Sequence, residues 1–176
     1  MEKICSFIGH RIEKFNFIDE NDINCITLKH LLIEQINNIY LEGTKIFLTG
    51  GAIGVEIWCG EIVLNLKQKY NDLKLYSIIP FENQSKKWSC DYKKRHKNLL
   101  DNSNGRIIMQ KYYTKDCYLK RNKFLVDKCT TLLGVYDGIS KKSKTYSTLD
   151  YAINENKEVI YINCNNYKVY NVIKNI

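Results

Sequence analysis

The sequence predicts an α/β fold with a mostly parallel sheet and helices on both of its faces. Short apolar runs alternate with stretches of helical periodicity along the whole chain, an alternation typical of parallel sheets. A glycine-rich break joins one of these runs, residues 45–48, to a helical stretch that starts near Ala52. The chain has 176 residues and neither a repeat nor a linker, so we expect one Rossmann-like domain spanning residues 1–176.

Six apolar or β-branched runs are expected to form the strands of this sheet. They cover residues 3–9, 45–48, 73–79, 106–109, 131–136 and 158–162. Six stretches in which apolar residues recur every three or four positions are expected to be helical. They cover residues 22–41, 52–66, 91–100, 114–129, 148–155 and 167–176. Residues 140–147 are polar and predict a loop between the fifth strand and the next helix.

The glycine turn, Gly50-Gly51-Ala52-Ile53-Gly54, follows the second strand and opens the second helix. This arrangement holds phosphate in α/β folds, because free N–H groups and the helix dipole point at the ligand. The spacing matches neither the dinucleotide pattern nor a Walker loop, so a tight turn without a ligand stays an alternative. Glu56 follows in the first helical turn, where it either binds ribose hydroxyls or offsets the helix dipole.

The first strand ends in Gly9-His10-Arg11. The carboxyl ends of parallel strands form the edge where ligands bind in open α/β sheets. An arginine there can pair with a phosphate or a carboxylate through two hydrogen bonds, and His10 can donate one. The alternative is that Arg11 fixes the following loop at the surface. Glu61, deeper in the second helix, is expected to pair with Arg11 or Arg121.

Candidate binding residues also follow the third strand. Gln84 and Trp88 lie one helical turn apart, so they would offer an amide and an aromatic face to a base or a ribose. The alternative for Trp88 is packing in the core. His96 belongs to the basic stretch at residues 91–100 and is expected to face solvent.

The fifth strand ends in Asp137-Gly138 and leads to a loop rich in lysine and hydroxyl side chains. Hydroxyl groups before a helix can cap it and donate to phosphate, and lysines add positive charge. The loop and the start of the helix supply Lys141, Lys142, Lys144, Thr145, Ser147 and Thr148. Together with residues 9–11 and 50–54, they predict one anion-binding edge of the sheet.

Composition narrows the classes of function. The net charge of +8 favours an anionic partner, but the lysines are dispersed and no nucleic-acid-binding motif gathers them. Seven cysteines include no C-x-x-C pair, so we expect neither zinc nor disulfides, and no other metal or cofactor is indicated. No apolar run approaches the roughly 20 residues of a membrane span, and no signal-peptide pattern opens the chain. We therefore expect a cytoplasmic protein.

The assembled motifs resemble those of the YpsA-like branch of the SLOG superfamily, Rossmann-like proteins related to the LOG phosphoribohydrolases and to the DprA core. The pattern G-H-R is matched by residues 9–11, and G-G-A-x-G-x-D/E-x-W-x-x-E by residues 50–61. P-F-x-x-Q-x-x-x-W is matched by residues 80–88, and R-N by Arg121 and Asn122. V-D, a strand and Y-D-G follow in order. The resemblance covers residues 4–153 and implies binding of a nucleotide or a nucleotide derivative.

One motif departs from this resemblance. The family's G-G-T-x-x-T-x-x-Y-A corresponds to residues 143–152, where serine and lysine replace the two glycines. The lysine is expected to supply charge in place of a close backbone approach. Tyr151 stands where the LOG enzymes have their catalytic glutamate. Because glycosidic cleavage needs a carboxylate, activity of the LOG type would depend on Glu56 or Asp137.

Three hypotheses about function follow. The first is a protein that binds a nucleotide-derived small molecule, such as an ADP-ribose derivative or a cyclic nucleotide, as a sensor or as a sequestering sponge. The second is an N-glycoside hydrolase or a phosphoribosyl-handling enzyme that uses Glu56 or Asp137. The third, ranked last, is a DprA-like protein associated with single-stranded DNA, which rests on net charge and fold analogy. The resemblance also implies a homo-oligomer, a dimer or larger.

Overall fold

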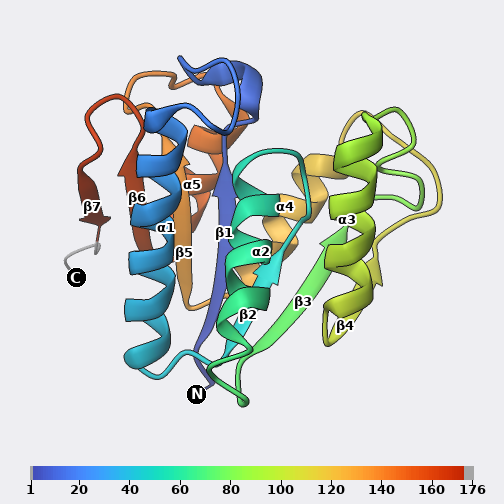
Figure 1. The fold of residues 1–176 in the computed structure, drawn as a ribbon, viewed down its shortest axis with the longest axis horizontal. Coiled ribbons are helices and arrows are strands. Elements are labelled where there is room, and N and C mark those ends of the chain that lie inside the picture. The colour runs from blue at the N-terminus through green and yellow to red at the C-terminus, as the bar shows by residue number, and fades with distance from the viewer. Residues whose placement is uncertain (1, 173–176) are drawn as a thin grey trace.

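A seven-stranded sheet forms the centre of the computed structural model, which describes residues 2–172 (Figure 1). The strands lie in the order β4-β3-β2-β1-β5-β6-β7, and every neighbouring pair is parallel except β6 with β7. They are β1 (Ile4–Gly9), β2 (Ile46–Thr49), β3 (Lys74–Ile79), β4 (Gly105–Ile108), β5 (Thr131–Tyr136), β6 (Glu158–Asn163) and β7 (Val169–Val172). The predicted α/β class and mostly parallel sheet are confirmed.

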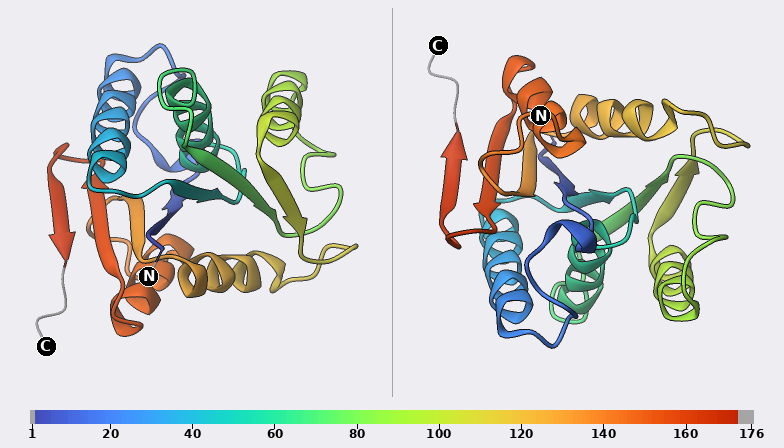
Figure 2. Two further views of the ribbon diagram at one scale, coloured as in Figure 1. Left: turned by 90° about the horizontal axis from the view of Figure 1, so that it is seen from below. Right: turned by 90° about the horizontal axis from the view of Figure 1, so that it is seen from above.

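Helices cover both faces of the sheet, as the sequence predicts. Figure 2 shows α1, α2 and α3 on one face and α4 with α5 on the other. Their bounds are α1 (Ile23–Leu41), α2 (Val55–Leu66), α3 (Cys90–Asn102), α4 (Cys117–Lys128) and α5 (Lys144–Asn154), and a short 3-10 helix, η1 (Ile12–Lys14), follows β1. Each of these five α-helices connects two parallel strands, so each begins at the edge where the parallel strands end.

Two predicted helices differ from the structure. The one expected at residues 148–155 begins earlier, at Lys144, because the Ser143 hydroxyl accepts a hydrogen bond from the Tyr146 N–H at 3.1 Å and caps the helix. The closing helix expected from residue 167 is wrong, since β7 pairs there with β6 in an antiparallel ladder. Residues 173–176 of that expected helix lie outside the described residues.

The larger part of the core lies between the sheet and the pair α1–α2. Phe7 of β1 and Phe47 of β2 are fully buried and stack with their ring centroids 5.8 Å apart. Trp58 of α2 is 1% exposed and stacks on Phe15, from the segment after η1, also at 5.8 Å. Burying a side chain of this kind contributes about 1.5–3 kcal/mol. The core therefore fixes β1, β2 and α2; the end of β1 and the start of α2 border the candidate site described below.

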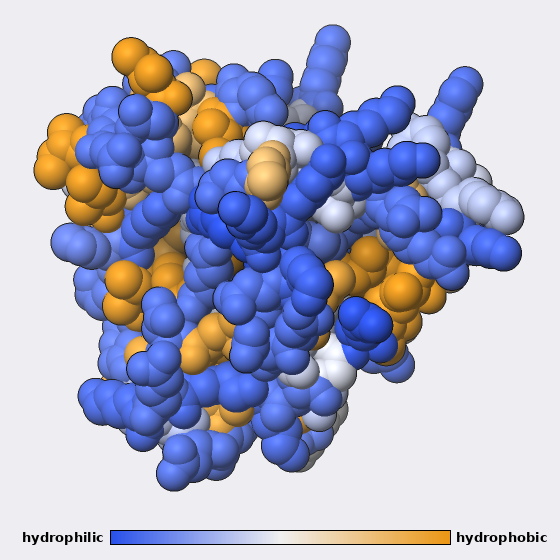
Figure 3. Space-filling model, turned by 45° about the vertical axis from the view of Figure 1, so that its right-hand side comes forward, coloured by the Kyte–Doolittle hydropathy of each residue, from blue (hydrophilic) through white to orange (hydrophobic). Residues whose placement is uncertain are grey.

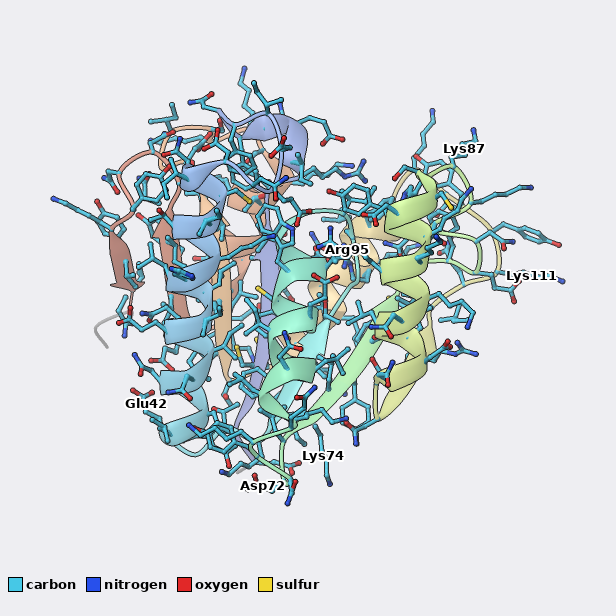
Figure 4. All side chains as sticks on the ribbon, viewed as in Figure 1. Glu42, Asp72, Lys74, Lys87, Arg95 and Lys111 are labelled. Carbon is cyan, nitrogen blue, oxygen red and sulfur yellow. The ribbon has the colours of Figure 1, made fainter. Side chains whose placement is uncertain are left out.

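The ion-pair partner of Glu61 and the burial of His96 differ from what the sequence predicted. Glu61 pairs with Arg95 of α3, through Nε–Oε1 at 2.7 Å and Nη2–Oε2 at 2.8 Å, so the expected pairing with Arg11 or Arg121 is wrong. Figure 4 shows Arg95 in the space between α3 and α2. His96 is 4% exposed, and its Nδ1 lies 3.2 Å from a backbone carbonyl oxygen of the glycine turn. The expected solvent exposure of His96 is therefore wrong as well.

Glu20 joins the same ionic cluster and ties the segment after η1 to α1 and α3. Its carboxylate accepts hydrogen bonds from Arg95 at 2.7 Å, Lys29 at 2.5 Å and the Tyr92 hydroxyl at 2.9 Å. Burial acts to raise the pKa of Glu20, but the hydrogen bonds from Arg95 and Lys29 outweigh it and lower the pKa to about 2. The stabilisation by this carboxylate is present above its unfolded pKa of 4.5 and is lost as the pH falls toward 2.

Glu20→Gln is therefore expected to lower the free energy of unfolding by about 1–3 kcal/mol at pH 7. The difference from the wild type should shrink between pH 4.5 and pH 2, because the wild-type carboxylate becomes protonated in that range. Urea unfolding at several pH values measures it. Asp101→Asn is the control, since among residues 2–172 Asp101 pairs only with the exposed Lys97, and it should change stability by about 0.5 kcal/mol or less. A difference that stays constant with pH would contradict the expectation.

Hydrophilic side chains cover most of the face seen in Figure 3, and apolar ones appear there in separate patches. Within residues 2–172, no helix has the length and apolar character needed to cross a membrane. Nor do three histidine, cysteine or acidic side chains gather as a metal site requires in that part of the chain. All seven cysteines have free thiols, and five of them are buried.

Candidate functional site

A cleft of about 980 Å³ opens at the edge of the sheet where the parallel strands end. Strand β1 lies between β2 and β5, and the helices that follow β1 and β5 cover opposite faces (Figure 2). This is the topological switch point at which open α/β sheets bind ligands. The cleft is lined by the end of β1 with η1, the start of α2, the start of α4 and the loop before α5. In Figure 1, η1 and the loop before α5 meet at the upper end of the molecule.

The start of α2 lies directly against the end of β1 because two glycines leave room for it. A Cβ atom on Gly54 would lie 2.9 Å from the carbonyl oxygen of His10, and the φ of +95° at Gly54 strains any other residue. A Cβ atom on Gly9 would lie 2.5 Å from the Cβ of Val55. The first turn of α2 therefore borders the cleft, where Glu56 forms part of the wall. Backbone N–H groups of a first helical turn have no partner within their helix and attract anions.

A buried ion pair connects α2 to α4 at the base of the cleft. Arg121 Nη1 donates to Glu56 Oε2, and the two side chains are only 3% and 5% exposed. The same carboxylate oxygen accepts a hydrogen bond from the Ala52 N–H at 3.2 Å. Gly50 leaves space for the guanidinium, because a Cβ atom there would lie 1.0 Å from Arg121 Nη1. Glu56 is therefore committed to Arg121 and to the glycine turn.

His10 connects the end of β1 to α5 and to the end of β5. Its Nδ1 lies 3.2 Å from the Thr145 hydroxyl oxygen, and its Nε2 lies 3.7 Å from Asp137 Oδ2. Burial lowers the pKa of His10 below its ordinary value of 6.5, although the Asp137 carboxylate acts in the opposite direction. His10 is therefore neutral at pH 7 and acts in the cleft as a hydrogen-bonding group.

Three buried polar atoms on the cleft wall have no hydrogen-bond partner within residues 2–172. They are His10 Nε2, Arg121 Nε and Asn122 Oδ1. The Asn122 amide nitrogen donates to the Thr148 hydroxyl at 3.0 Å, which fixes the side chain with its oxygen unused. Because buried polar groups are nearly always paired in native proteins, these atoms indicate hydrogen-bonding capacity available to a ligand or to water.

Positive charge dominates the side chains of the cleft. Six cations line it, against two carboxylates, Glu13 and Glu56. The cations are Arg11, Lys14, Arg121, Lys141, Lys142 and Lys144. Across residues 2–172, Arg121 is the one member of this set with a carboxylate oxygen within 4.0 Å. The remaining five cations define a strongly anion-attracting cleft.

Just over half of the residues predicted from the sequence line this cleft. They are Gly9, His10, Arg11, Ala52, Glu56, Arg121, Asn122, Lys141, Lys142, Lys144 and Thr145. The other predicted residues lie outside the lining. These are Gly50, Gly51, Gly54, Gln84, Trp88, Asp137, Gly138, Ser147 and Thr148.

Gln84 and Trp88 lie near the glycine turn but outside the cleft lining. The Gln84 amide donates to the Gly50 carbonyl oxygen at 3.4 Å. His96 contacts the next carbonyl, that of Gly51, and Trp88 packs edge-on against the His96 ring with centroids 5.0 Å apart. Gln84 and Trp88 therefore contact the glycine turn or its neighbour His96 and lie outside the cleft lining. Their contact with a base or a ribose stays a prediction.

Asp137 shapes the loop before α5. It accepts hydrogen bonds from the backbone N–H groups of Ile139 and Ser140 at 3.0 and 2.9 Å, and from the Ser140 hydroxyl. Burial acts to raise the pKa of Asp137, but these hydrogen bonds outweigh it and lower the pKa below its ordinary value. Ser147 donates to the Ser143 carbonyl oxygen at 3.2 Å, within the first turn of α5. Both side chains therefore fix the lysine-rich loop that lines the cleft.

Sequence reasoning missed four polar or aromatic residues of the lining. They are Glu13, Lys14, Tyr113 and Tyr118. A signal for Tyr118 was present, because it precedes Arg121 by three residues in a helix and so shares its face. Tyr151, at the position of the LOG glutamate, lies outside the lining and donates to Asp127 at 2.8 Å.

Comparison with known proteins assigns the chain to a family. The family model YpsA, described as the YspA SLOG family, matches residues 5–168. A UPF0398 protein of Halalkalibacterium halodurans is 27% identical over 146 residues, which cover 82% of this chain and 77% of that protein. A UPF0398 protein of Bacillus cereus strain G9842 is 28% identical over 130 residues, covering 73% and 70% respectively. The resemblance seen in the sequence motifs is confirmed, and the chain belongs to the YpsA family of SLOG proteins.

Proposed function

We propose that this protein binds a phosphate-bearing, nucleotide-derived small molecule in the cleft at the end of β1. One observation carries the proposal: five cations that have no carboxylate partner within residues 2–172 line a single cleft at the switch point of the sheet. Such a concentration of like charge disfavours the empty cleft and is relieved by a bound anion.

The backbone around the cleft supports an anionic ligand as well. The first turns of α2 and α5 both contribute residues to the lining. Helix N-termini favour negative charge through their free N–H groups and the helix dipole. The unused oxygen of Asn122 and the neutral ring of His10 add sites for hydroxyl or amide groups. A nucleotide derivative combines the required phosphates, hydroxyls and amides in one molecule.

The geometry favours binding over glycosidic cleavage. A glycosidase of the LOG type needs a carboxylate beside the sugar. Glu56 is held by Arg121 and by the Ala52 N–H, and Asp137 is occupied by the loop before α5. We therefore favour a sensor or a sponge over the hydrolase. A homo-oligomer stays a prediction.

Isothermal titration calorimetry of the purified protein tests the proposal. The panel consists of nucleoside mono- and diphosphates, cyclic nucleotides, ADP-ribose and inorganic pyrophosphate. We expect at least one nucleotide derivative to bind at one site per chain and to be recovered intact after the complex is denatured. Recovery of free base would support the hydrolase instead. Absence of binding to every nucleotide derivative would refute the proposal.

The lysine-rich loop offers a direct test of the charge argument. Replacing Lys141, Lys142 and Lys144 together by alanine should weaken binding of an anionic ligand by about 1–3 kcal/mol per lost charge-assisted contact. Wild-type affinity should fall as salt rises, and the triple variant should show a shallower dependence. The unfolding free energy should change by about 0.5 kcal/mol or less, because these are surface side chains.

A second triple variant provides the matched control. Lys69, Lys74 and Lys87 are exposed and lie outside the cleft lining, and Figure 4 shows Lys74 at the lower end of the molecule. Their replacement by alanine removes the same net charge from other surfaces. We expect nearly wild-type affinity and salt dependence from this control. Equal losses in both triple variants would mean that net charge, and not the loop, determines binding.

A further inference from the structure

Three cations from three separate segments surround the ring of one tyrosine in the cleft. The guanidinium carbons of Arg11 and Arg121 lie 5.4 and 5.8 Å from the centroid of the Tyr118 ring, and Lys144 Nζ lies 6.0 Å from it. Arg11 follows β1, Arg121 belongs to α4, and Lys144 opens α5. Tyr118 is thus the place where three sequence-distant charges of the cleft come together.

The ring supplies an attraction to Arg11 and Lys144, which have no carboxylate partner, and adds to the ion pair of Arg121 with Glu56. Within residues 2–172, neither Arg11 nor Lys144 has a carboxylate oxygen within 4.0 Å. Like charges repel, and long side chains lose rotamer freedom when they are held in place. The negative face of an aromatic ring attracts a cation within about 6 Å. Tyr118 therefore offsets part of the repulsion and restricts the three side chains before any anion arrives.

The position of the Tyr118 ring is itself fixed. Tyr118 lies in the first turn of α4, three residues before Arg121 and so on the same helix face. Phe81 packs against the ring at right angles with centroids 6.1 Å apart. A ring held in this way is a rigid platform, and a rigid binding group costs less entropy when the ligand binds.

We propose that Tyr118 is a positioning and specificity residue that gathers Arg11, Arg121 and Lys144 into one site for a compact, multiply charged phosphate group such as a diphosphate. The inference rests on the proposed function and deepens it, because it assigns this part of the cleft to the phosphates of the ligand. A base does not need to stack on Tyr118. A base-free polyphosphate should accordingly bind at the same place.

Inorganic pyrophosphate is the probe, and titration calorimetry measures its affinity for the purified protein. We expect Tyr118→Leu to bind pyrophosphate about tenfold more weakly than the wild type, the scale of losing a cation–π interaction in a partly desolvated site. Tyr118→Phe keeps the ring and should retain wild-type affinity. Tyr118→Met serves as a second ring-free variant if the leucine variant does not fold. Circular dichroism verifies the fold of each variant.

Tyr112→Leu is the matched control. Tyr112 is 72% exposed, has one lysine at 5.4 Å from its ring and lies outside the cleft lining, so its loss should leave pyrophosphate affinity unchanged. Unchanged affinity in a folded Tyr118→Leu or Tyr118→Met variant would overturn the role of Tyr118. A loss seen with nucleotides alone would assign the ring to base stacking and also overturn it. If the wild type binds nucleotides but does not bind pyrophosphate, the inference fails while the proposed function stands. If the wild type binds no nucleotide derivative, the proposed function itself fails.

Discussion

Replacing Arg121 by leucine is expected to lower the free energy of unfolding by about 3–5 kcal/mol. The guanidinium is buried and pairs with Glu56, so its removal leaves an uncompensated carboxylate at the base of the cleft. A buried carboxylate without a partner pays its desolvation cost uncompensated. Urea unfolding of the variant and the wild type at pH 7 measures the difference.

The double variant Glu56→Gln/Arg121→Leu is the control for this expectation. It removes both charges, so it should recover part of the lost stability relative to Arg121→Leu alone. The size of that recovery measures the interaction between the two side chains. If the loss of unfolding free energy in the double variant equals the sum of the losses in Arg121→Leu and in Glu56→Gln, the two residues act independently.

Gly50→Ala is expected to destabilise the fold by about 3 kcal/mol or more, because the new methyl group would overlap with the ion pair between Arg121 and Glu56. Its Cβ would lie 1.0 Å from Arg121 Nη1 and 2.4 Å from Glu56 Oε2. Arg121 would have to leave its position, and Glu56 would lose its partner. Thermal and urea unfolding measure the loss, and ligand affinity should fall with it since Arg121 lines the cleft.

Gly43→Ala separates this steric effect from the general cost of losing a glycine. Gly43 has a φ of +104° but no atom within 4 Å of an added Cβ, so its replacement costs backbone strain alone, about 1–2 kcal/mol. Gly50 is not among the described glycines with positive φ. Similar losses in the two variants would contradict the view that close packing of Arg121 is what requires glycine at position 50.

The fold was predictable because its signals are local. Apolar runs such as the one ending at Gly9 differ clearly from helical periodicity, and their alternation implies a parallel sheet. Strand ends in a parallel sheet meet at one edge, so the grouping of residues 9–11, 50–56 and 141–145 followed from topology. Strand β7 was missed because a short, mostly exposed edge strand has little apolar patterning. It is a strand because it pairs with β6, which the local sequence does not reveal.

The partners within the site were less predictable, because they depend on the packing of distant segments. Glu61 faces α3 and not the cleft, which the helix period alone does not reveal. His96 lies in a basic stretch, yet it is buried and contacts the carbonyl oxygen of Gly51 in the glycine turn. Gln84 matched a family motif, and the structure places it against the Gly50 carbonyl oxygen, outside the cleft lining. A motif records which residues belong together, whereas tertiary contacts decide which of them face a ligand.

The central position of β1 has a consequence for the order in which the cleft can form. The Ile4 N–H donates to the hydroxyl of Thr130, 126 residues further along the chain, and β1 then pairs with β5. Loop closure over such a distance is slow and is completed late in the folding of sheet proteins. During synthesis from the N-terminus, residues up to β4 emerge before the second wall of the cleft exists. The cleft is therefore complete only when α4, β5 and α5 have joined the first half of the sheet, and binding of the proposed ligand would report on the completion of the whole fold.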